Sequence, residues 1–440
     1  MLFGTDGIRG VANEFLTAEL ALTAGRAIVA VLPDRSPRVI IGRDTRISGP
    51  MLESALVAGI SSAGGIAELA GVIPTPAVAS LVLSQGADAG AVISASHNPY
   101  RDNGIKFFGA DGFKLTDKQE AGIERRMEAA AGAGPEPCEP GAVHLLANPV
   151  ELYLDDLLTG LDLDLSGLRI LLDCANGATW ESAPLALRRL GADVSVTGAE
   201  PDGFNINHEC GSTHVDKLQE IMKTGEYDLG LAFDGDGDRV MAVDATGSVV
   251  DGDFIMAICA AYLKSRGLLS GDTVVTTVMT NLGFHLAMKE LGITVRTTDV
   301  GDRYVLEEML AGDFALGGEQ SGHIINLETG STGDGLATSL LLLKAMTGTG
   351  VPLHDLVKVM RRLPQKLVNI RVADKDALDG AGAVWEKVEE QSALLGDEGR
   401  ILVRPSGTEP VVRVMVEAAS PERCRDVCDS IVAVIRKSLG

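Results

Sequence analysis

The stretch Asp228-Leu-Gly-Leu-Ala-Phe-Asp-Gly-Asp-Gly-Asp-Arg-Val-Met-Ala-Val243 places an acidic loop between two apolar runs. Runs of this length and apolar content are typical of buried strands, which would seat the loop at the end of a sheet. Residues two apart in an extended loop point the same way, so the carboxylates of Asp234, Asp236 and Asp238 can converge on one point. The stretch therefore predicts a strand, an acidic loop and a second strand.

Three carboxylates gathered at one point repel each other unless a cation lies among them. Hard oxygen ligands favour a hard divalent ion, and Mg²⁺ is expected if phosphate oxygens complete its coordination. A calcium loop of the helix-loop-helix type also begins with alternating acidic residues, but Arg239 and Ala245 occupy its glycine and glutamate positions. A solvated acidic turn is the alternative without a metal, and the apolar flanks count against it.

A second loop, Ala95-Ser-His-Asn-Pro99, follows the strand-like residues Val92 and Ile93. Asn98-Pro99 forces a change of direction there. A serine on such a corner can present its hydroxyl to a ligand while the backbone around it stays fixed, which makes Ser96 a candidate nucleophile. On residue types alone an ordinary turn is the commoner explanation.

Two further loops carry polar groups that suit a phosphorylated sugar. Arg404-Pro-Ser-Gly-Thr-Glu-Pro410, followed by Arg413, offers hydroxyls and successive backbone N–H groups that can form an anion-binding nest flanked by arginines. Gly317-Gly-Glu-Gln-Ser-Gly-His323 sets a carboxylate, an amide, a hydroxyl and an imidazole on a glycine-hinged loop. Each of these two motifs is common when it occurs alone.

Outside these loops, strand-like and helix-like segments alternate, which indicates α/β architecture. We expect strands at 38–42, 168–172, 193–196, 273–278 and 293–297, and helices at 49–64, 180–190, 254–265, 283–291 and 303–310. After Leu363-Pro364 the pattern changes to a strand, a helix, a hairpin bearing the nest, and a final helix capped by Ser420. We place domain boundaries at 1–148, 149–249, 250–363 and 364–440, with a surface connection near 129–143.

Composition restricts the partners of the chain. The 440 residues are long enough for several domains, and a formal charge of −23 argues against nucleic acid and anionic membranes, which bind basic faces. An anionic ligand for the nest would therefore have to be attracted by local cations. The candidates, most of them in glycine-rich turns, are Arg9, Arg43, Arg46, Lys106, Arg239, Arg303, Arg404 and Arg413; scattered surface positions are the alternative for Arg43, Arg46 and Arg303.

The cysteines and apolar runs indicate a cytoplasmic protein. None of the six cysteines forms a C-x-x-C pair or a zinc-site spacing, and Cys424 and Cys428 are expected to face a core. No apolar run approaches the roughly 20 residues that span a bilayer, and Leu336–Leu343 is expected to be a buried helix segment. Oligomeric state cannot be derived from these features, and a homodimer is left open.

Together the motifs resemble one family, the phosphohexomutases of the α-D-phosphohexomutase superfamily, which move a phosphoryl group between the 6- and 1-positions of a hexose. The resemblance runs from Gly4-Thr-Asp-Gly-Ile-Arg-Gly10 and Gly42-Arg-Asp-Thr-Arg-Ile-Ser-Gly49 through the four loops in the family's order. It implies an α/β fold with three similar mixed α/β domains and a smaller C-terminal α+β domain around a central cleft.

Within the family the chain looks most like the branch that acts on glucosamine phosphates and feeds amino-sugar nucleotide synthesis. Asn103-Gly-Ile-Lys-Phe-Phe108, Asn205-Ile-Asn207, Cys210-Gly-Ser-Thr-His214 and Gln320 carry that likeness. Pro405 departs from it, because this branch often has lysine there, and resembles the mannose branch instead. A preference for mannose or glucose phosphates is therefore the first alternative.

The resemblance also implies roles for individual residues. Phosphorylated Ser96 is the phosphoryl donor, one Mg²⁺ per chain is bound by Asp234, Asp236, Asp238 and the Ser96 phosphate, and a bisphosphorylated hexosamine primes the enzyme. The catalytic set is Ser96, Lys106, His97, Arg239 and Arg9. The substrate-binding set is Glu319, Gln320, Ser321, His323 and Arg303, and the phosphate-binding set is Arg404, Ser406, Gly407, Thr408 and Arg413.

Three questions stay open at this point. Lys106 and His97 are both candidates for the general base; Lys106 can instead clamp a phosphate, and His97 can instead orient the serine loop. A metal-dependent sugar phosphatase is an alternative from another class, in which water attacks the phosphoserine. The third alternative is a phosphosugar-binding sensor without catalytic activity, but such a protein would be expected to lack Ser96 or one of the three aspartates of the acidic loop.

Overall fold

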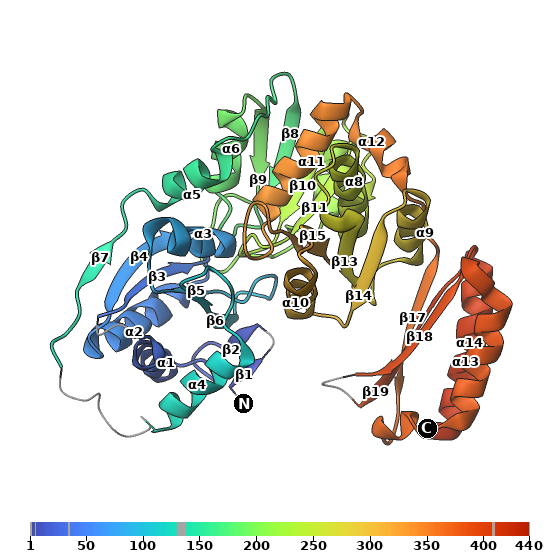
Figure 1. The fold of residues 1–440 in the computed structure, drawn as a ribbon, viewed down its shortest axis with the longest axis horizontal. Helices are drawn as coiled ribbons and strands as arrows, with labels where there is room; N and C mark the ends of the chain where they lie inside the picture. Colours follow the sequence, from blue (N-terminus) through green and yellow to red (C-terminus); the bar gives the residue numbers. More distant parts are fainter. Residues whose placement is uncertain (1, 5, 34–35, 130–137, 407–409, 440) are drawn as a thin grey trace. The chain divides into compact units, whose positions relative to one another are not determined.

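The protein is described here by a computed structural model that covers residues 2–4, 6–33, 36–129, 138–406 and 410–439. The chain forms two compact units. The first comprises Met1–Met279 and Ile293–Val359, and the second comprises Thr280–Gly292 and Met360–Gly440. Figure 1 gives the labels of the helices and strands.

The first sheet of unit 1 is mixed and has the order β1-β2-β6-β5-β3-β4-β7. Strands β3, β4, β5 and β7 run parallel to their neighbours in that group, whereas β6, β2 and β1 join by antiparallel pairs. The strands are β1 Phe3–Gly4, β2 Gly7–Val11, β3 Arg38–Arg43, β4 Ile66–Val72, β5 Ala89–Ile93, β6 Asp102–Gly109 and β7 Val143–Leu145.

Helices cover both faces of this sheet (Figure 1). They are α1 Ala18–Val31, α2 Gly49–Ser62, α3 Thr75–Gln85 and α4 Asp117–Ala129. Helices α1, α2 and α4 share one core with Val39 and Ile41 of β3, and α3 packs against β3 and β5. Because both faces are covered, the middle of β3 is continuously apolar rather than alternating.

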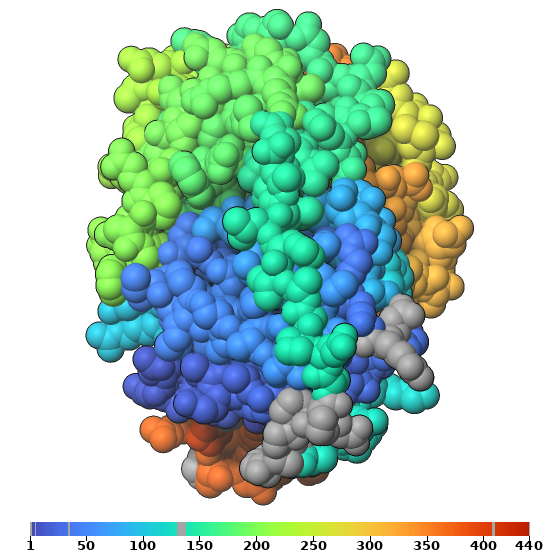
Figure 2. Space-filling model, turned by 90° about the vertical axis from the view of Figure 1, so that its left-hand side faces the viewer, coloured from blue at the N-terminus to red at the C-terminus, as the bar shows by residue number. Residues whose placement is uncertain are grey.

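The chain then passes from the first sheet to the second along the surface. Figure 2 shows residues after 138 lying over the first domain on their way to the next one. Strand β7 lies in this stretch and pairs parallel with β4, and all three of its residues are exposed. Helix α5 Pro149–Leu158 follows. Of the expected surface connection at 129–143, the last residue, Val143, begins this strand, and residues 130–137 lie outside the described residues.

The second sheet has the order β12-β11-β10-β8-β9. Its parallel part is β10, β8 and β9, and β11 and β12 are added antiparallel. The strands are β8 Arg169–Asp173, β9 Asp193–Thr197, β10 Leu229–Phe233, β11 Val240–Asp244 and β12 Val249–Val250, with helices α6 Ser182–Arg189 and α7 Asp216–Met222. Leu218 and Met222 of α7 pack on Leu171 and Ala232 of the sheet.

The third sheet has the order β14-β13-β15-β16, with only the last pair antiparallel. The strands are β13 Thr273–Thr277, β14 Thr294–Thr298, β15 Leu316–Gly318 and β16 Ile324–Asn326. The helices of this part are α8 Gly252–Ser265, α10 Asp302–Gly312, α11 Gly335–Thr349 and α12 Leu353–Leu356. Val305 and Met309 of α10 pack against Val275 of the central strand β13.

Unit 2 contains a small antiparallel sheet in the order β17-β19-β18. Its elements are β17 Gln365–Arg371, β18 Arg400–Pro405, β19 Val411–Glu417, α9 Leu282–Glu290, α13 Gly382–Leu395 and α14 Pro421–Leu439. The buried carboxylate of Glu417 accepts hydrogen bonds from the Asn281 side chain at 2.9 Å and from the Leu282 N–H at 3.0 Å. Helix α9 is thereby joined to the C-terminal sheet.

The structure confirms the α/β architecture that the sequence predicted. Every strand and helix expected above is present, with ends that differ by at most two residues. Cys424 and Cys428 are buried in the core of unit 2, and the described cysteines are free. Among the described residues, no single helix combines the length and apolar content needed to cross a membrane; α11 passes that test only jointly with Leu353–Val359, across an 89° bend.

Candidate active site

Three of the four predicted loops lie together in unit 1. The serine loop follows β5, the aspartate loop joins β10 to β11, and the sugar-loop candidate joins β15 to β16. In the second sheet Phe233 pairs with Val240, so the six residues between them form a closed hairpin loop. The Val240 N–H donates to the Gly322 carbonyl at 3.1 Å, which ties the aspartate loop to the sugar loop.

Ser96 is buried against the aspartate loop rather than exposed on its corner. The residue is 1% exposed, and its Oγ donates to Asp234 Oδ2 at 2.5 Å. The backbone of Ser96 has a φ of 51°, a left-handed conformation that costs energy for a residue other than glycine. The surrounding loop holds this conformation, because the Ser96 N–H donates to Ser94 Oγ at 3.0 Å.

A buried ion pair supports the serine loop from inside the first domain. Arg46 and Asp44 are both 0% exposed, and Arg46 Nε donates to Asp44 Oδ2 at 2.8 Å. The remaining guanidinium N–H groups donate to the carbonyls of Ser96, Asn98 and Pro99. The Arg46 guanidinium therefore satisfies three carbonyls of the turn that carries the nucleophile candidate.

Asp234, Asp236 and Asp238 converge as their spacing predicts. All three are buried, and one carboxylate oxygen of each lies within 4.8 Å of the others. Two glycines permit the approach: a Cβ on Gly235 would lie 2.6 Å from the Ser96 carbonyl oxygen, and Gly237 has a φ of +73°. The aspartates of this alternating sequence thus supply the converging carboxylates, and the glycines allow the aspartate loop to pack closely on the serine loop.

The carboxylates fit a divalent cation. Asp236 Oδ1 and Asp238 Oδ1 are buried and have no hydrogen-bond partner among the described atoms, and such orphan oxygens are costly unless something else binds them. Burial raises the pKa of Asp234 well above its usual value, and the charges of Asp238 and Asp236 raise it further. The three carboxylates therefore repel one another, and a bound cation would relieve this repulsion.

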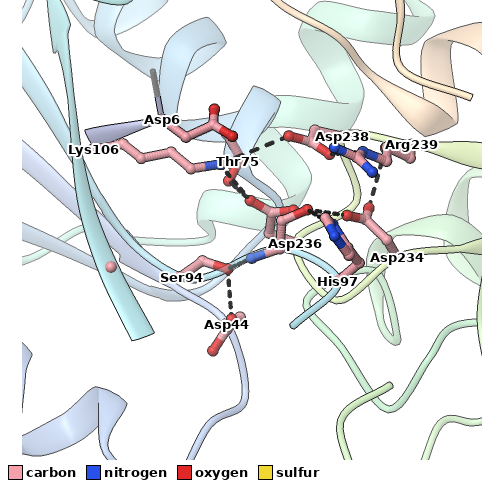
Figure 3. A network of polar contacts seen from close by, with 12 residues as sticks. Asp6, Asp44, Thr75, Ser94, His97, Lys106, Asp234, Asp236, Asp238 and Arg239 are labelled. Atoms are coloured by element: carbon pink, nitrogen blue, oxygen red, sulfur yellow. Dashed lines mark hydrogen bonds and ion pairs between the residues drawn. The ribbon is translucent and has the colours of Figure 1, made fainter. Parts of the chain in front are cut away.

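Lys106 on β6 reaches into the same group of carboxylates (Figure 3). Its Nζ lies 3.0 Å from Asp236 Oδ2 and 3.7 Å from Asp238 Oδ2, and its side chain is 2% exposed. Burial alone would lower the pKa of Lys106, but the charges of Asp236, Asp238 and Asp6 outweigh it and the pKa is raised. Lys106 is consequently a cation in this structure.

His97, Arg9 and Arg239 lie around Ser96 and the aspartates. His97 Nδ1 is 3.4 Å from Ser96 Oγ, and burial, together with the charges of Arg239 and Arg9, lowers the pKa of His97. The Arg239 N–H donates to Asp234 Oδ1 at 3.1 Å, and its Nε lies 3.8 Å from Asp238. Arg9 pairs with Asp6 at 3.2 Å.

The sugar-loop candidate presents its polar groups in an organised way. Glu319 Oε1 accepts from the Gly301 N–H at 3.1 Å, and its Oε2 accepts from Ser321 Oγ at 3.3 Å. Gln320 donates through Nε2 to Asp253 at 3.3 Å. His323 is 2% exposed and lies 3.6 Å from Asp238, so this loop meets the aspartate loop directly.

Arg303 has different partners from the rest of the predicted substrate-binding set. Its guanidinium pairs with Glu120 at 2.9 Å and with Asp117, both on α4 of the first domain. These contacts link α10 to α4 and engage the guanidinium in ion pairs.

The predicted phosphate nest lies in unit 2. Arg404 of β18 is paired with Arg413 of β19 in the hairpin register, and Ser406 is 2% exposed. Lys375 Nζ donates to the Ser406 carbonyl at 2.7 Å, which adds a cation that sequence reasoning missed. Gly407 and Thr408, which were predicted to bind phosphate, lie outside the described residues.

Sequence reasoning also missed several residues that shape the site. Thr75 Oγ1 donates to Asp236 Oδ2 at 2.7 Å, and Asn207 Nδ2 donates to the Ser96 carbonyl at 2.9 Å. Asn207 belongs to a motif already noted, but nothing in the pattern shows that it contacts Ser96. Thr75 is the first residue of α3, an ordinary apolar helix, and carries no sequence signal.

Comparison with known proteins decides the family. Four consecutive segments match the phosphoglucomutase/phosphomannomutase domains: residues 1–133 the α/β/α domain I, 151–247 domain II, 251–363 domain III and 367–434 the C-terminal domain. The chain belongs to the phosphoglucomutase/phosphomannomutase family. The three α/β/α domains and the small C-terminal sheet of the family are the architecture described above.

Individual relatives agree with the family assignment. The chain is 52% identical over 441 residues to a phosphoglucosamine mutase of Pelotomaculum thermopropionicum, covering 99% of both chains. A putative phosphomannomutase structure from Thermus thermophilus is similar, with a TM-score of 0.79, 26% identity and coverage of 99% of this chain and 98% of that one. The fold is shared by an Aspergillus fumigatus N-acetylphosphoglucosamine mutase in complex with GlcNAc-6P and magnesium, with a TM-score of 0.68, 18% identity and coverage of 100% and 96%.

Proposed function

We propose that this chain interconverts glucosamine 6-phosphate and glucosamine 1-phosphate through a phosphorylated Ser96 and a bisphosphorylated sugar. The observation that carries the proposal is the contact of Ser96 Oγ with Asp234 inside a buried triad of carboxylates that has orphan oxygens. Full-length relatives about half identical to the chain are phosphoglucosamine mutases, which supports the choice of sugar.

Asp234, Asp236 and Asp238 would hold one Mg²⁺, with an oxygen of the Ser96 phosphate as a further ligand. The ion would neutralise charge on the transferring phosphoryl group. The choice of Mg²⁺ rests on the all-oxygen ligand set and on the buried carboxylate oxygens that have no hydrogen-bond partner in the part of the chain that the structure describes.

The reaction proceeds in two transfers. The hydroxyl on C1 of glucosamine 6-phosphate attacks the phosphorus of phosphoserine 96, the P–O bond to Ser96 Oγ breaks, and the hydroxyl proton passes to a base. The sugar now carries two phosphates and turns end for end. Ser96 Oγ, which takes up a proton when the first transfer releases it, then gives that proton to a base and attacks the phosphorus of the 6-phosphate. The bond between this phosphorus and O6 of the sugar breaks, O6 takes up a proton, and glucosamine 1-phosphate is released from a rephosphorylated enzyme.

The remaining loops would bind the sugar and its phosphate. Glu319, Gln320, Ser321 and His323 contact hydroxyls in both orientations, and Arg404, Ser406, Gly407, Thr408 and Arg413 bind the phosphate that is not transferred. Arg239 and Arg9 steady the oxygens of the phosphoserine. For Arg303 the ion pairs with α4 favour a role in holding domains together over direct contact with the sugar.

Two side chains near Ser96 can move the proton, and their resting states differ. His97 is neutral near pH 7, because its pKa is lowered. Lys106 keeps its proton because of the carboxylates beside it, so it can act as a base only when their charge is neutralised. Profiles of kcat/KM against pH for His97→Gln and Lys106→Met distinguish them: the variant that loses the acid limb of the profile has lost the base.

The proposal is tested by replacing Ser96 with alanine. Intact wild-type protein should carry an added phosphate, which excess glucosamine 6-phosphate removes only as bisphosphorylated sugar escapes between the two transfers, and Ser96→Ala should carry none and turn over at least about 10⁴-fold more slowly. Binding of the phosphosugar should persist in the variant, as measured by calorimetry. A Ser96→Ala enzyme with near-normal turnover would refute the proposal.

Phosphomannomutase or phosphoglucomutase activity is the second candidate, which Pro405 favours. The sugars differ at C2, where one group usually changes binding by a few kcal/mol. Turnover is therefore compared on glucosamine, glucose and mannose 6-phosphates, each with its own bisphosphate as primer. A kcat/KM for mannose phosphate equal to or above that for glucosamine phosphate would reassign the substrate.

A sugar phosphatase, in which water attacks the phosphoserine, is disfavoured because full-length relatives about half identical to the chain are phosphoglucosamine mutases. Release of inorganic phosphate faster than isomerisation would reverse this assignment.

We further propose the domain boundaries 1–148, 149–249, 250–363 and 364–440. We also propose a cytoplasmic location, in keeping with the buried unpaired cysteines.

A further inference from the structure

A run of alternating charges passes through unit 1 and connects elements of three domains. Asp6 follows β1, Lys114 follows β6, Asp302 begins α10, His323 lies between β15 and β16, and Asp238 is in the aspartate loop. Lys114 Nζ is 3.1 Å from Asp6 Oδ1 and also contacts Asp302. Asp302 in turn lies 3.7 Å from His323 Nε2, and His323 Nδ1 lies 3.6 Å from Asp238.

This run is shielded from water. The exposed fractions of the side chains are 12% for Lys114, 14% for Asp302 and 3% for His323. Burial alone would lower the pKa of Lys114, but Asp302 and Asp6 raise it above its usual value, so Lys114 is charged. Removing one member of a buried ion pair leaves the other charge without compensation. The side chains around that charge must then rearrange, so these ion pairs determine the local geometry.

The ring of His323 is oriented by carboxylates on both sides. Its Nε2 is buried and has no hydrogen-bond partner among the described atoms, which leaves Asp302 as the acidic group facing it. The ring lies directly against Gly333, where an added Cβ would come within 2.4 Å of it. His323 thus sits in a tight space in which a shift of Asp302 moves the ring relative to the aspartate loop.

We infer that Lys114 and Asp302 are positioning residues for the proposed mutase reaction: Lys114 fixes the Asp302 carboxylate, and Asp302 fixes the ring of His323 beside the aspartate loop. This inference rests on the proposed function and adds to it two residues from outside the four recognised loops. It also explains why an aspartate begins α10 at this position, since its carboxylate bridges a lysine of the first domain and the sugar loop.

The chain offers a matched control for this bridge. Glu120 of α4 pairs with Arg303, the neighbour of Asp302 on α10, and so joins the same two domains. Unlike Asp302, Glu120 has no described contact with His323. If the substitutions act only by loosening the packing of α10 on the first domain, the Asp302 and Glu120 variants should lower activity to a similar extent. If loss of the Asp302 carboxylate misplaces His323, only the Asp302 variant should lower activity.

The test compares Asp302→Asn, Lys114→Met and Glu120→Gln, using the hexose 6-phosphate that the wild-type enzyme converts fastest. The first two variants should lower kcat about 10- to 100-fold and change KM less than about threefold, because misplacement by around 1 Å has effects of that size. Glu120→Gln should change either constant less than about twofold. Lys114→Arg, which keeps the charge, should recover most of the loss, and thermal melting checks that each variant is folded.

A double-mutant cycle tests whether Asp302 acts through His323. Asp302→Asn should have little further effect on kcat in a His323→Gln background, because the ring that it positions is absent. A full additional loss in that background, or an equal loss in Glu120→Gln, would overturn the inference. A wild-type enzyme that converts no hexose phosphate would instead refute the proposed function, so the two failures are distinguishable.

Discussion

At the scale of single residues, the site depends on groups that hold Ser96 as much as on Ser96 itself. The left-handed φ of 51° at Ser96 is unfavourable for a serine and persists because its backbone groups are bonded on both sides. The carbonyl of Ser96 accepts from both Arg46 and Asn207. The reactive hydroxyl is therefore placed by backbone contacts that reach it from two domains.

We expect Arg46→Lys to misplace the serine loop. A lysine can keep the pairing with Asp44, but its single ammonium cannot reach the carbonyls of Ser96, Asn98 and Pro99 together. kcat should fall about 10- to 100-fold with little change in KM, and the melting temperature should drop. Arg38→Lys is the control, because Arg38 of β3 pairs with Glu68 of β4 at a more exposed position. Equal effects of the two variants would contradict this role of Arg46.

At the scale of elements, the aspartate hairpin packs so closely on the serine loop that one glycine is obligatory. We expect Gly235→Ala to displace the loop, because its Cβ would lie 2.6 Å from the Ser96 carbonyl and 2.7 Å from Asn207 Nδ2. The loss of stability should be about 1–3 kcal/mol, with weaker Mg²⁺ dependence of activity. Gly330→Ala, where the added atom meets nothing within 4 Å, should be neutral. Denaturant melts and Mg²⁺ titrations of turnover provide the measurements.

Helix α11 carries a titratable cap whose effect on stability can be measured. The Asp334 carboxylate accepts from the N–H groups of Leu336 and Ala337 and from the Tyr153 hydroxyl. Burial raises its pKa to about 6. A carboxyl whose pKa is higher in the folded state is stabilising when protonated, so this contribution is present below about pH 4 and is lost as the pH rises to about 6.

Asp334→Asn should remove that part of the pH dependence. Asparagine does not ionise, and its oxygen still caps the helix. Above about pH 6 the free energy of unfolding of the variant should therefore exceed that of the wild type, by up to about 3 kcal/mol, which is the value that corresponds to the pKa shift of Asp334. Free energies of unfolding at pH 4 and pH 7 for both proteins are the measurement. The same pH dependence in wild type and variant would show that another group is responsible.

At the scale of the whole molecule, the sheets of unit 1 concentrate negative charge at one point of an already acidic chain. Mg²⁺ that binds only the folded state should raise its stability by about 2–3 kcal/mol at a concentration 100 times the dissociation constant. Asp234→Asn should lose most of this gain, and in EDTA it should melt above the wild type, because burial and the neighbouring aspartates disfavour the Asp234 charge. Calorimetric melts with and without Mg²⁺ test both statements. An unchanged Mg²⁺ response in the variant would place the ion elsewhere.

The division into units also shows which helix packs with the C-terminal sheet. Helix α9 belongs by sequence to domain III, yet it forms one compact unit with residues after Met360. Asn281 explains this, because its side chain accepts from the Leu363 N–H at 2.9 Å and donates to the buried Glu417. A domain boundary drawn from sequence near Leu363 could not include this contact, since the partners lie over 80 residues apart.

The sequence by itself determined the alternation of strands and helices, the convergence of Asp234, Asp236 and Asp238, and the membership of one family, because these follow from local periodicity, spacing and ordered motifs. Only the tertiary structure decided which distant groups meet. Arg46, for which a scattered surface position was the alternative, is 0% exposed and bonded to the serine turn, and Lys114 meets Asp302 across 188 positions. Such contacts depend on how the sheets pack, and no short-range pattern records that.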